Sequence, residues 1–512
     1  MPYIWAMFRQ GEAWHFTGFL FGVEDGNSYI AKMLAGSYGA WLFRTPYTTA
    51  PQTGILAFLP YLLLGKLASG PALHDQLVAL FHLARVAATF VGVLATYRFA
   101  SRFLPDEPSR RWSTLLATVG GGLGWLLVVI GRGSLLGSLP LDFYSPETFG
   151  FLAYLGLPHL IVGRALLLTC LGWFLDAAER EDRAAWAGAG LLALGLFQPL
   201  AVVSAWAVIG AYIVLEAVVG GQPHMELGRR VGTASKVVLF SSPVVVYYGL
   251  LGSTDPFARE WTAQNIIRSP HPVHYAIAYG LLLAVALTGW RLLRSGGPSL
   301  MLAGWILLLP LLAYAPIDLQ RRLPDGVWVA IVIMAAAAVR TWKPHQARRG
   351  RVALAAVSLP SSLILVVGAL RAASTPGYPA FVPTESVSAF EALAERARPG
   401  DAVMASFESG NILPAWVPVH VPIGHGPESI GLRDLRGEVS RFFDADTDDD
   451  ERLQFLTEHD IRFVFAGPWE RQLGDWDPAS EGYLLGLYSG GDYAIYGVAI
   501  PDDCGCGEEK GG

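Results

Sequence analysis

Charged side chains are scarce in this chain of 512 residues. Asp, Glu, Lys and Arg together make up 16% of it, whereas hydrophobic residues make up 53%. A soluble globular protein carries roughly 25% charged residues, so this chain has too few to cover a water-exposed surface along its whole length. Its net charge of −6 also lacks the basic excess that is typical of nucleic-acid-binding proteins. The composition therefore predicts an integral membrane protein with no nucleic-acid partner.

Cysteine is also rare, with three residues in the chain. Cys170 lies in an apolar run, and Cys504 and Cys506 lie in a Gly-rich segment that we expect to be a flexible tail, 503–512. Three cysteines exclude a disulfide framework, and one C-x-C pair lacks the four ligands of a structural zinc site. No Gly-rich phosphate loop or nucleophile elbow follows a predicted strand.

Long apolar runs dominate the middle of the chain. A helix needs about 20 apolar residues to cross a hydrocarbon core of roughly 30 Å. A shorter run, 185–197, is interpreted as an abbreviated crossing, because Pro199 can begin the next helix. The run 53–69 is broken by Pro60, Gly65 and Lys66, which favours a helix at the membrane surface. With the short run included, about ten crossings are expected, the longer ones near 75–98, 113–131, 157–176, 199–219, 232–251, 273–291, 299–315, 326–342 and 352–371.

Basic residues concentrate in alternate loops. The loops 98–112 and 343–351 are rich in Arg and Lys, and positive charge in short loops marks the cytoplasmic side. This places 1–74, the intervening loops and the C-terminal part on the extracytoplasmic face of a bacterial-type inner (plasma) membrane. The first residues, MPYIWAMFRQ, form neither an apolar span nor a signal peptide. We therefore expect a first transmembrane helix to be encoded upstream, which the upstream genomic sequence can test.

Composition changes near residues 372–380, at a stretch rich in Pro and Gly. We predict a transmembrane domain over 75–372 and an extracytoplasmic α/β domain over 380–502. The expected helices are 385–398, 432–443 and 450–459, and the expected strands are 401–406, 418–423, 461–466, 484–489 and 493–499. This domain is interpreted as an accessory that covers the site or binds acceptor glycan. The segments 407–411 and 424–426 are candidates for its rim, although turns are the favoured interpretation.

An acidic pair, Glu24 and Asp25, is the most informative feature of the first loop. It is followed by Asn27, Tyr29 and the aromatic-rich run YGAWLFRTPYT. A carboxylate among aromatic residues at a membrane surface can have a raised pKa or bind a cation, and either suits general-base chemistry. An ordinary solvated loop with interfacial aromatic anchors fits the same residues.

The order of these features resembles the first extracytoplasmic loop of the GT-C superfamily. The order is an acidic pair, a tyrosine, a small amphipathic helix, Trp and Pro, then a surface helix and a span that contains Arg85. The superfamily comprises polyprenyl-linked glycosyltransferases such as protein O-mannosyltransferases and lipid-A aminoarabinose transferases. The resemblance covers residues 10–372 and implies that Asp25 is catalytic, with Glu24 second. The chain departs from it at the N-terminus, where the family has a transmembrane helix.

A second outer loop, LPLDFYSPETFGFLAYLGLPH, supplies Asp142, Glu147 and His159. Brought near Asp25, a histidine and carboxylates could hold a divalent cation or orient an acceptor. The alternative is a structural one, because 145–147 reads as a helix start. Metal use varies among the enzymes that the chain resembles, so the sequence leaves the cation open.

Two arginines, Arg321 and Arg322, lie in an outer loop against the positive-inside bias. Guanidinium groups match phosphate oxygens, so a polyprenyl phosphate head group is the predicted partner. Local pairing with Asp318 or Asp325 is the alternative.

The loop 255–275 carries side chains that suit a sugar, because aromatic rings stack on its CH faces and amides bind its hydroxyls. An interfacial belt explains them equally well. The candidate residues are Trp261, Gln264 and Asn265.

Together these features predict a polytopic all-α membrane domain, with surface helices and a C-terminal soluble α/β domain. The predicted function is a GT-C-like hexosyl- or pentosyltransferase that moves a sugar from a polyprenyl-phosphate donor to a glycan or protein acceptor. Asp25 would deprotonate or orient the acceptor, and Arg321 and Arg322 would hold the leaving phosphate. A transporter or flippase of lipid-linked glycans should instead show paired repeats, and a non-catalytic assembly protein needs only one span.

Overall fold

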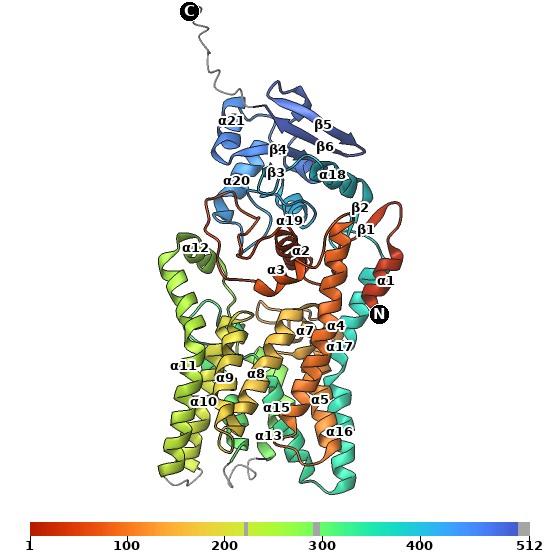
Figure 1. Ribbon diagram of the computed structural model, residues 1–512. Coiled ribbons are helices and arrows are strands. Elements are labelled where there is room, and N and C mark those ends of the chain that lie inside the picture. The colour runs from red at the N-terminus through yellow and green to blue at the C-terminus, as the bar shows by residue number, and fades with distance from the viewer. Residues whose placement is uncertain (220–223, 290–296, 500–512) are drawn as a thin grey trace, which may run out of the picture.

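The computed structural model describes residues 1–219, 224–289 and 297–499. Long helices run side by side and form a bundle, and a smaller α/β domain lies beyond one of its ends (Figure 1). Two short helices of the N-terminal region, α2 (Val23–Ser37) and α3 (Leu59–Gly65), lie between the two parts. The predicted tail 503–512 lies outside the described residues.

Six of the described helical segments are long and apolar enough to cross a membrane. Their outer faces carry exposed apolar side chains such as Phe90, Leu239 and Leu363, which is how a surface in contact with lipid differs from one in contact with water. The chain is therefore a multi-pass membrane protein. The six are α4 (Leu73–Ala100), α8 (Pro158–Asp176), α10 (Pro199–Val219), α11 (His224–Thr254), η3 (Gln320–Arg322) with α15 (Val327–Arg340), and α16 (Pro344–Ser358) with α17 (Pro360–Ser374).

Shorter helices complete the bundle. Two of them, α13 (Val273–Thr288) and α14 (Ser299–Ala313), are apolar, and α9 (Asp182–Gly195) fills the place of the predicted abbreviated crossing. The run 53–69 contains only the seven-residue α3, which is too short to cross. The remaining short helices are α7 (Gly150–Gly156), α12 (Pro256–Gln264) and η1 (Leu141–Phe143).

The helix predicted to cross the membrane at 113–131 is not continuous. The segment forms two helices, α5 (Glu107–Val119) and α6 (Gly124–Val129). Three glycines follow α5, and Gly120 adopts an extended conformation that ends the helix. The next turn packs directly on another helix, because a Cβ atom at Gly122 would lie 2.6 Å from the Cα atom of Ala278. Close backbone packing therefore replaces a continuous helix here.

The N-terminal region is fastened to the start of the C-terminal domain. Helix α1 (Pro2–Arg9) packs against α17. Strand β1 (Trp14–Phe16) pairs antiparallel with β2 (Phe381–Pro383), with Phe16 opposite Phe381. Segments that are far apart in the sequence thus meet beside the bundle (Figure 1).

A four-stranded sheet in the order β3-β4-β6-β5 forms the C-terminal domain, with β3 and β4 parallel and the other neighbours antiparallel. The predicted strand 418–423 contributes only one bridge, between His420 and Ala402. Pro418 has no N–H to donate, and the N–H of Val421 binds the carbonyl of Pro46 in the first loop instead. The strands are β3 (Ala402–Met404), β4 (Ile461–Ala466), β5 (Leu484–Gly490) and β6 (Tyr493–Val498), and the helices are α18 (Thr384–Ala394), α19 (Phe407–Trp416), α20 (Leu432–Phe442), α21 (Asp449–Glu458), α22 (Pro468–Leu473) and η4 (Pro478–Ser480).

Helix α2 is packed on all sides. It shares an apolar cluster with α4, through residues such as Met33 and Phe81, and it also contacts α19 of the C-terminal domain. Its contact with α3 is backbone to backbone, because a Cβ atom at Gly65 would lie 1.8 Å from the carbonyl oxygen of Met33. This packing holds the first turn of α2 in a fixed place between bundle and domain.

Candidate active site

The predicted acidic pair begins helix α2. Gly22 precedes the helix in the left-handed conformation, with φ of 54°, which glycine adopts without strain. Glu24 and Asp25 therefore occupy the first turn, where the positive end of the helix dipole favours negative charge. The local sequence thus explains why two adjacent carboxylates are stable at this point.

The two carboxylates of the pair contact the same loop of the C-terminal domain. Asp25 Oδ1 lies 3.2 Å from Nε2 of His425, and Glu24 Oε1 accepts a hydrogen bond of 2.8 Å from the backbone N–H of Gly426. The Asp25 side chain keeps 59% of its surface exposed. Glu24 is therefore occupied by a backbone contact, whereas Asp25 is oriented by a histidine and still open to a ligand.

The pKa of Asp25 is lowered, not raised as the sequence suggested. Burial of the surroundings favours a raised pKa, but the hydrogen bond and charge of His425 outweigh it, with help from Lys32 and Arg322. A cationic environment stabilises the ionised form. Asp25 is consequently a carboxylate at neutral pH.

A second carboxylate, Glu428, is buried behind His425. Its oxygens accept hydrogen bonds from Lys32 Nζ at 2.7 Å, Ser28 Oγ at 2.9 Å and Thr45 Oγ1 at 2.9 Å. Burial alone would raise the pKa of Glu428, but the charge of Lys32 reverses the shift and lowers it. Glu428 thus stays ionised and binds the first loop to the C-terminal domain.

This buried network also favours the charged form of His425. Nδ1 of His425 lies 3.8 Å from Glu428 Oε1, while its Nε2 faces Asp25. Burial alone would lower the pKa of His425, but the negative charges of Glu428 and Asp25 raise it overall. The charged form of the histidine is therefore favoured beside Asp25.

Arg322 reaches the same place from the loop before α15. Its charge lowers the pKa of Asp25, its Nε lies 3.8 Å from Glu147 Oε1, and 45% of its side chain is exposed. The alternative of local neutralisation is wrong, because the two acidic residues of the loop have other partners. Asp325 binds Arg164 at 2.6 Å, and Asp318 binds Arg268 at 3.0 Å.

Arg321 takes a different direction from Arg322. Its guanidinium lies over the ring of Tyr144 at 4.7 Å, and its backbone N–H donates to the carbonyl of Ile267. The two neighbouring arginines therefore do not form one guanidinium pair.

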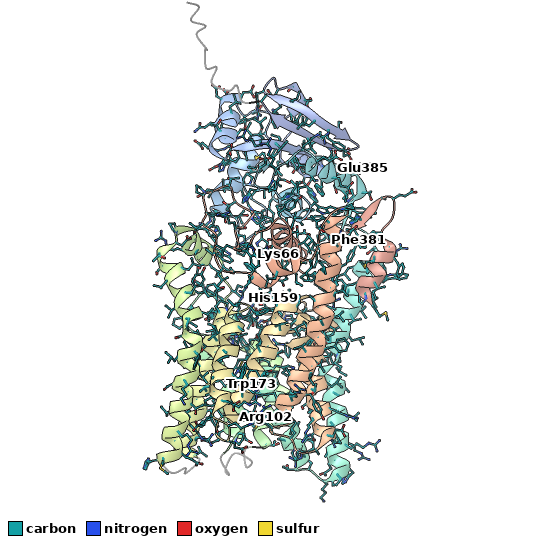
Figure 2. All side chains as sticks on the ribbon, viewed as in Figure 1. Lys66, Arg102, His159, Trp173, Phe381 and Glu385 are labelled. Atoms are coloured by element: carbon teal, nitrogen blue, oxygen red, sulfur yellow. The ribbon has the colours of Figure 1, made fainter. Side chains whose placement is uncertain are left out.

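His159 begins α8 directly after Pro158 and lies at the end of the bundle nearest the C-terminal domain, below Lys66 (Figure 2). Its Nδ1 is 2.6 Å from the hydroxyl of Tyr61. Its ring is 5.3 Å from that of Tyr29, a partly buried residue of α2 that is close enough to Asp25 and Arg322 for their charges to affect its pKa. His159 thus forms part of the aromatic floor beneath α2.

Asp142 has a structural position. One oxygen accepts hydrogen bonds of 2.7 Å from the backbone N–H of Gly122 and from Ser361 Oγ. Glu147 lies near Arg322, and His159 is within hydrogen-bond distance of Tyr61. The proposed cation ligands therefore make separate contacts and do not converge. Within the described residues, three ligand atoms converge instead at another place, His15, His74 and Asp75.

The residues expected to bind a sugar lie on α12 and at its end. Trp261 packs against Phe43 and Phe58 of the first loop. Gln264 donates a hydrogen bond of 3.1 Å to the carbonyl of Ser429, and Asn265 is the C-cap of the helix. The helix therefore forms a wall beside the loop that carries His425.

Sequence reasoning missed Lys32 and Glu428 and favoured a turn for His425. A signal existed for Lys32, because it lies on the same face of α2 as Asp25, Ser28 and Tyr29 at helical spacing. Glu428 and His425 had no comparable local signal, since they meet Asp25 only through the tertiary fold.

No protein-family model and no curated protein sequence matches the chain. Solved structures of membrane glycosyltransferases do match it. ArnT from Cupriavidus metallidurans superimposes in the apo state with a TM-score of 0.55 and 13% identity over 93% of both chains. Its complex with undecaprenyl phosphate gives a TM-score of 0.54 and 13% identity, over 98% of this chain and 96% of that one. The oligosaccharyltransferase AglB from Archaeoglobus fulgidus, in complex with an inhibitory peptide and a dolichol-phosphate, gives 0.56 and 12%, over 98% of this chain and 74% of that one.

These structures belong to the GT-C superfamily of membrane glycosyltransferases, and the chain has their fold over most of its length. The resemblance predicted from the first loop is confirmed at the level of the fold.

Proposed function

We propose that the chain is a GT-C-type transferase that moves a glycosyl group from a polyprenyl-phosphate-linked donor to an acceptor. The observation that carries the proposal is the environment of Asp25. An exposed carboxylate faces His425 and lies within the field of Lys32 and Arg322, so separate parts of the chain supply charge to one place. Clustering of this kind at an open position is typical of functional sites.

Arg322 is the proposed contact for the donor phosphate. It is half exposed, and its nearest anionic partner is 3.8 Å away, so its guanidinium has hydrogen-bonding capacity left for phosphate oxygens. Two of the structures with the same fold hold undecaprenyl phosphate and a dolichol-phosphate, which supports a lipid phosphate as the ligand. Arg321, packed on Tyr144, is proposed to shape the loop that carries Arg322.

Asp25 is the proposed proton acceptor, with Glu24 holding the loop beside it. The acceptor oxygen forms a bond to the anomeric carbon while the bond from that carbon to the phosphate oxygen breaks. The acceptor proton passes to Asp25, and the electron pair of the broken bond leaves with the phosphate. Because the lowered pKa of Asp25 makes it a weak base, proton transfer follows as attack makes the hydroxyl acidic. Attack opposite the phosphate inverts the anomeric centre.

The proposed acceptor region lies around α12 and the loop of His425. Gln264 binds that loop through Ser429, and Glu147 and His159 border the site from the bundle. Trp261 is packed on Phe43 and is proposed to support this wall. The acceptor is a glycan or protein.

We place the site on the extracytoplasmic face of an inner (plasma) membrane. Arg102, from the basic loop 98–112, lies near the end of the bundle away from the C-terminal domain (Figure 2). Since basic loops favour the cytoplasm, the end that carries Asp25 and the C-terminal domain would face outward. A polyprenyl phosphate in the outer leaflet would then lie level with Arg322.

The surroundings of Asp25 do not fit a divalent cation. Three cationic side chains, Lys32, Arg322 and His425, already act on this carboxylate, and their charge opposes a second cation at the same place. Of the other expected ligands, Glu147 faces Arg322 and Asp142 binds backbone and serine groups. The proposed transfer is therefore written without a metal at Asp25.

The test is sugar transfer in membranes that contain a radiolabelled polyprenyl-phosphate-sugar pool. Wild-type chain is compared with Asp25→Asn, which removes the proton acceptor, and with Glu24→Gln as the matched control. We expect transfer to be lost in Asp25→Asn and to persist in Glu24→Gln at equal protein levels. Undiminished transfer in Asp25→Asn would refute the assignment and favour a transport or assembly role.

A further inference from the structure

Two histidines and an aspartate converge where strand β1, the first turn of α4 and the end of α19 meet. One ligand atom from each of His15, His74 and Asp75 lies within 4.8 Å of the others. His15 comes from β1, and the other two residues come from α4. Neither histidine appears among the groups that contact Asp25 or Arg322 in the candidate active site, so the proposed transfer leaves this cluster unused.

His74 is held in the tautomer that a metal ligand needs. Its Nδ1 lies 2.9 Å from the carbonyl oxygen of Ala415, an acceptor, so Nδ1 carries the proton and Nε2 carries the lone pair. Metal-binding histidines almost always donate their other N–H to a carbonyl or carboxylate in this way. The ring also stacks on Trp416, with centroids 3.7 Å apart, which fixes its orientation.

The lone pair of His74 has no hydrogen-bond partner among the residues that the structure describes. His74 is only 4% exposed, and its buried Nε2 makes no hydrogen bond. The Nε2 of His15 is likewise buried without a hydrogen bond, and it lies 3.3 Å from Asp75 Oδ1. Buried polar atoms are normally satisfied. An unsatisfied imidazole nitrogen that converges with a second histidine and a carboxylate is what a bound cation would explain.

We propose that His15, His74 and Asp75 bind a zinc ion. Ligand atoms around a tetrahedral zinc lie about 3.3 Å apart, given metal–ligand distances of roughly 2.0–2.2 Å, and the His15–Asp75 pair already has this separation. Imidazole nitrogens select zinc and similar transition metals over magnesium and calcium. Asp75 is largely exposed, with 60% of its side chain accessible, so water can supply the fourth ligand.

The zinc has a structural role in this proposal. Its ligands join β1 to α4, and β1 is itself paired with β2 at the start of the C-terminal domain. The domain also contributes the carbonyl and the indole that orient His74. Zinc binding therefore fastens strand β1 and the C-terminal domain to the first turn of a membrane-crossing helix. This role is independent of the proposed sugar transfer.

The experiment measures zinc on the purified full chain in detergent, after chelation and reloading with Zn²⁺. We expect about one zinc per chain in wild type, and a thermal midpoint that rises on reloading with Zn²⁺ but not with Mg²⁺. His74→Gln should retain no zinc. Asp75→Asn, which changes an exposed side chain and should fold normally, should bind zinc at least tenfold more weakly.

His345→Gln is the matched control, because His345 is an exposed histidine at the start of α16. It should keep both the zinc and the thermal shift. Equal zinc affinity of wild type and Asp75→Asn, or a wild type that takes up no zinc, would overturn the proposal. Zinc that is lost equally from His345→Gln would show adventitious surface binding and would overturn it as well.

Discussion

The bundle and the layer above it bury charge in different ways. Inside the bundle, Arg164 and Asp325 are both almost fully buried and bind each other at 2.6 Å. In the layer between bundle and C-terminal domain, Asp25 faces several cations and still exposes more than half of its side chain. A closed pair satisfies its own charges and supports the fold, whereas an open carboxylate among cations retains the capacity to bind and react.

The largest expected effect is a loss of stability when the closed ion pair inside the bundle is broken. Arg164→Met leaves Asp325 as an unpaired buried acid and frees the carbonyl of Pro146, which Arg164 also binds. We expect a loss of about 3–5 kcal/mol in the free energy of unfolding, measured by denaturant titration in detergent micelles. The double variant Arg164→Met/Asp325→Leu should recover much of this loss. Equal stability of Arg164→Met and wild type would contradict the closed-pair interpretation.

The pair Lys32–Glu428 tests the comparison further, because it is a closed ion pair in the layer between bundle and C-terminal domain. The Lys32 side chain is fully buried and its Nζ lies 4.3 Å from the centroid of the Phe58 ring. Lys32→Met should therefore also cost about 3 kcal/mol or more of folding free energy. Combining it with Glu428→Gln, whose single amide oxygen can still accept from one of the two hydroxyl groups of Ser28 and Thr45, should restore part of the stability. Failure of the second substitution to help would show that charge pairing is not the cause.

Substitutions of the two arginines of η3 distinguish a phosphate contact from a packing contact. Arg322→Ala removes the proposed phosphate contact, and we expect kcat/KM for the lipid-linked donor to fall about 10²-fold. Arg321→Ala removes only the contact with Tyr144, so its effect on kcat/KM should stay within a few-fold. The measurement is initial-rate transfer with varied donor. Equal losses in the two variants would mean that the loop acts as a whole and that Arg322 has no special role.

The smallest expected effect comes from His425, which lowers the pKa of Asp25. Asp25 has a lowered pKa in the folded protein, so transfer should persist as pH falls and decline only when this carboxylate becomes protonated. His425→Gln removes the hydrogen bond and charge that lower the pKa, and the acid limb of the pH–rate profile should move to higher pH. The rate at neutral pH should fall about tenfold, the value of one charged hydrogen bond. An unchanged acid limb would show that His425 does not act on Asp25.

The membrane part of the fold was predictable because apolar runs of sufficient length are a local property of the sequence. The turn favoured at 407–411 is wrong, because this segment begins helix α19. Two other places where the prediction of local structure is wrong have tertiary causes. Gly120–Gly122 ends a helix where the backbone packs on α13, and Val421 gives its N–H to Pro46 rather than to a strand. The number of crossings is harder to predict from the sequence, because α9 and α14 are shorter than a full span.

Part of the site was predictable, again because its signal is a local property of the sequence. Asp25 and Arg322 are conspicuous locally, one at the start of a surface helix and the other against the charge bias of its loop. Their environment is not local, since His425 lies 400 positions from Asp25. A sequence rule therefore finds the candidate carboxylate but assigns the wrong direction to its pKa shift, because the groups that lower the pKa are brought near it only by the fold.

The most direct test of the central claim compares the same substitution in the two regions. Asp25→Asn changes the open carboxylate, and Asp176→Asn changes a bundle carboxylate that binds Arg102 at 2.6 Å. Transfer from a radiolabelled polyprenyl-phosphate sugar is measured for both, with the thermal midpoint of each protein. We predict that Asp25→Asn loses transfer by about 10³-fold with an unchanged midpoint, and that Asp176→Asn keeps transfer. Transfer that survives in Asp25→Asn, or is lost equally in Asp176→Asn, would contradict the account.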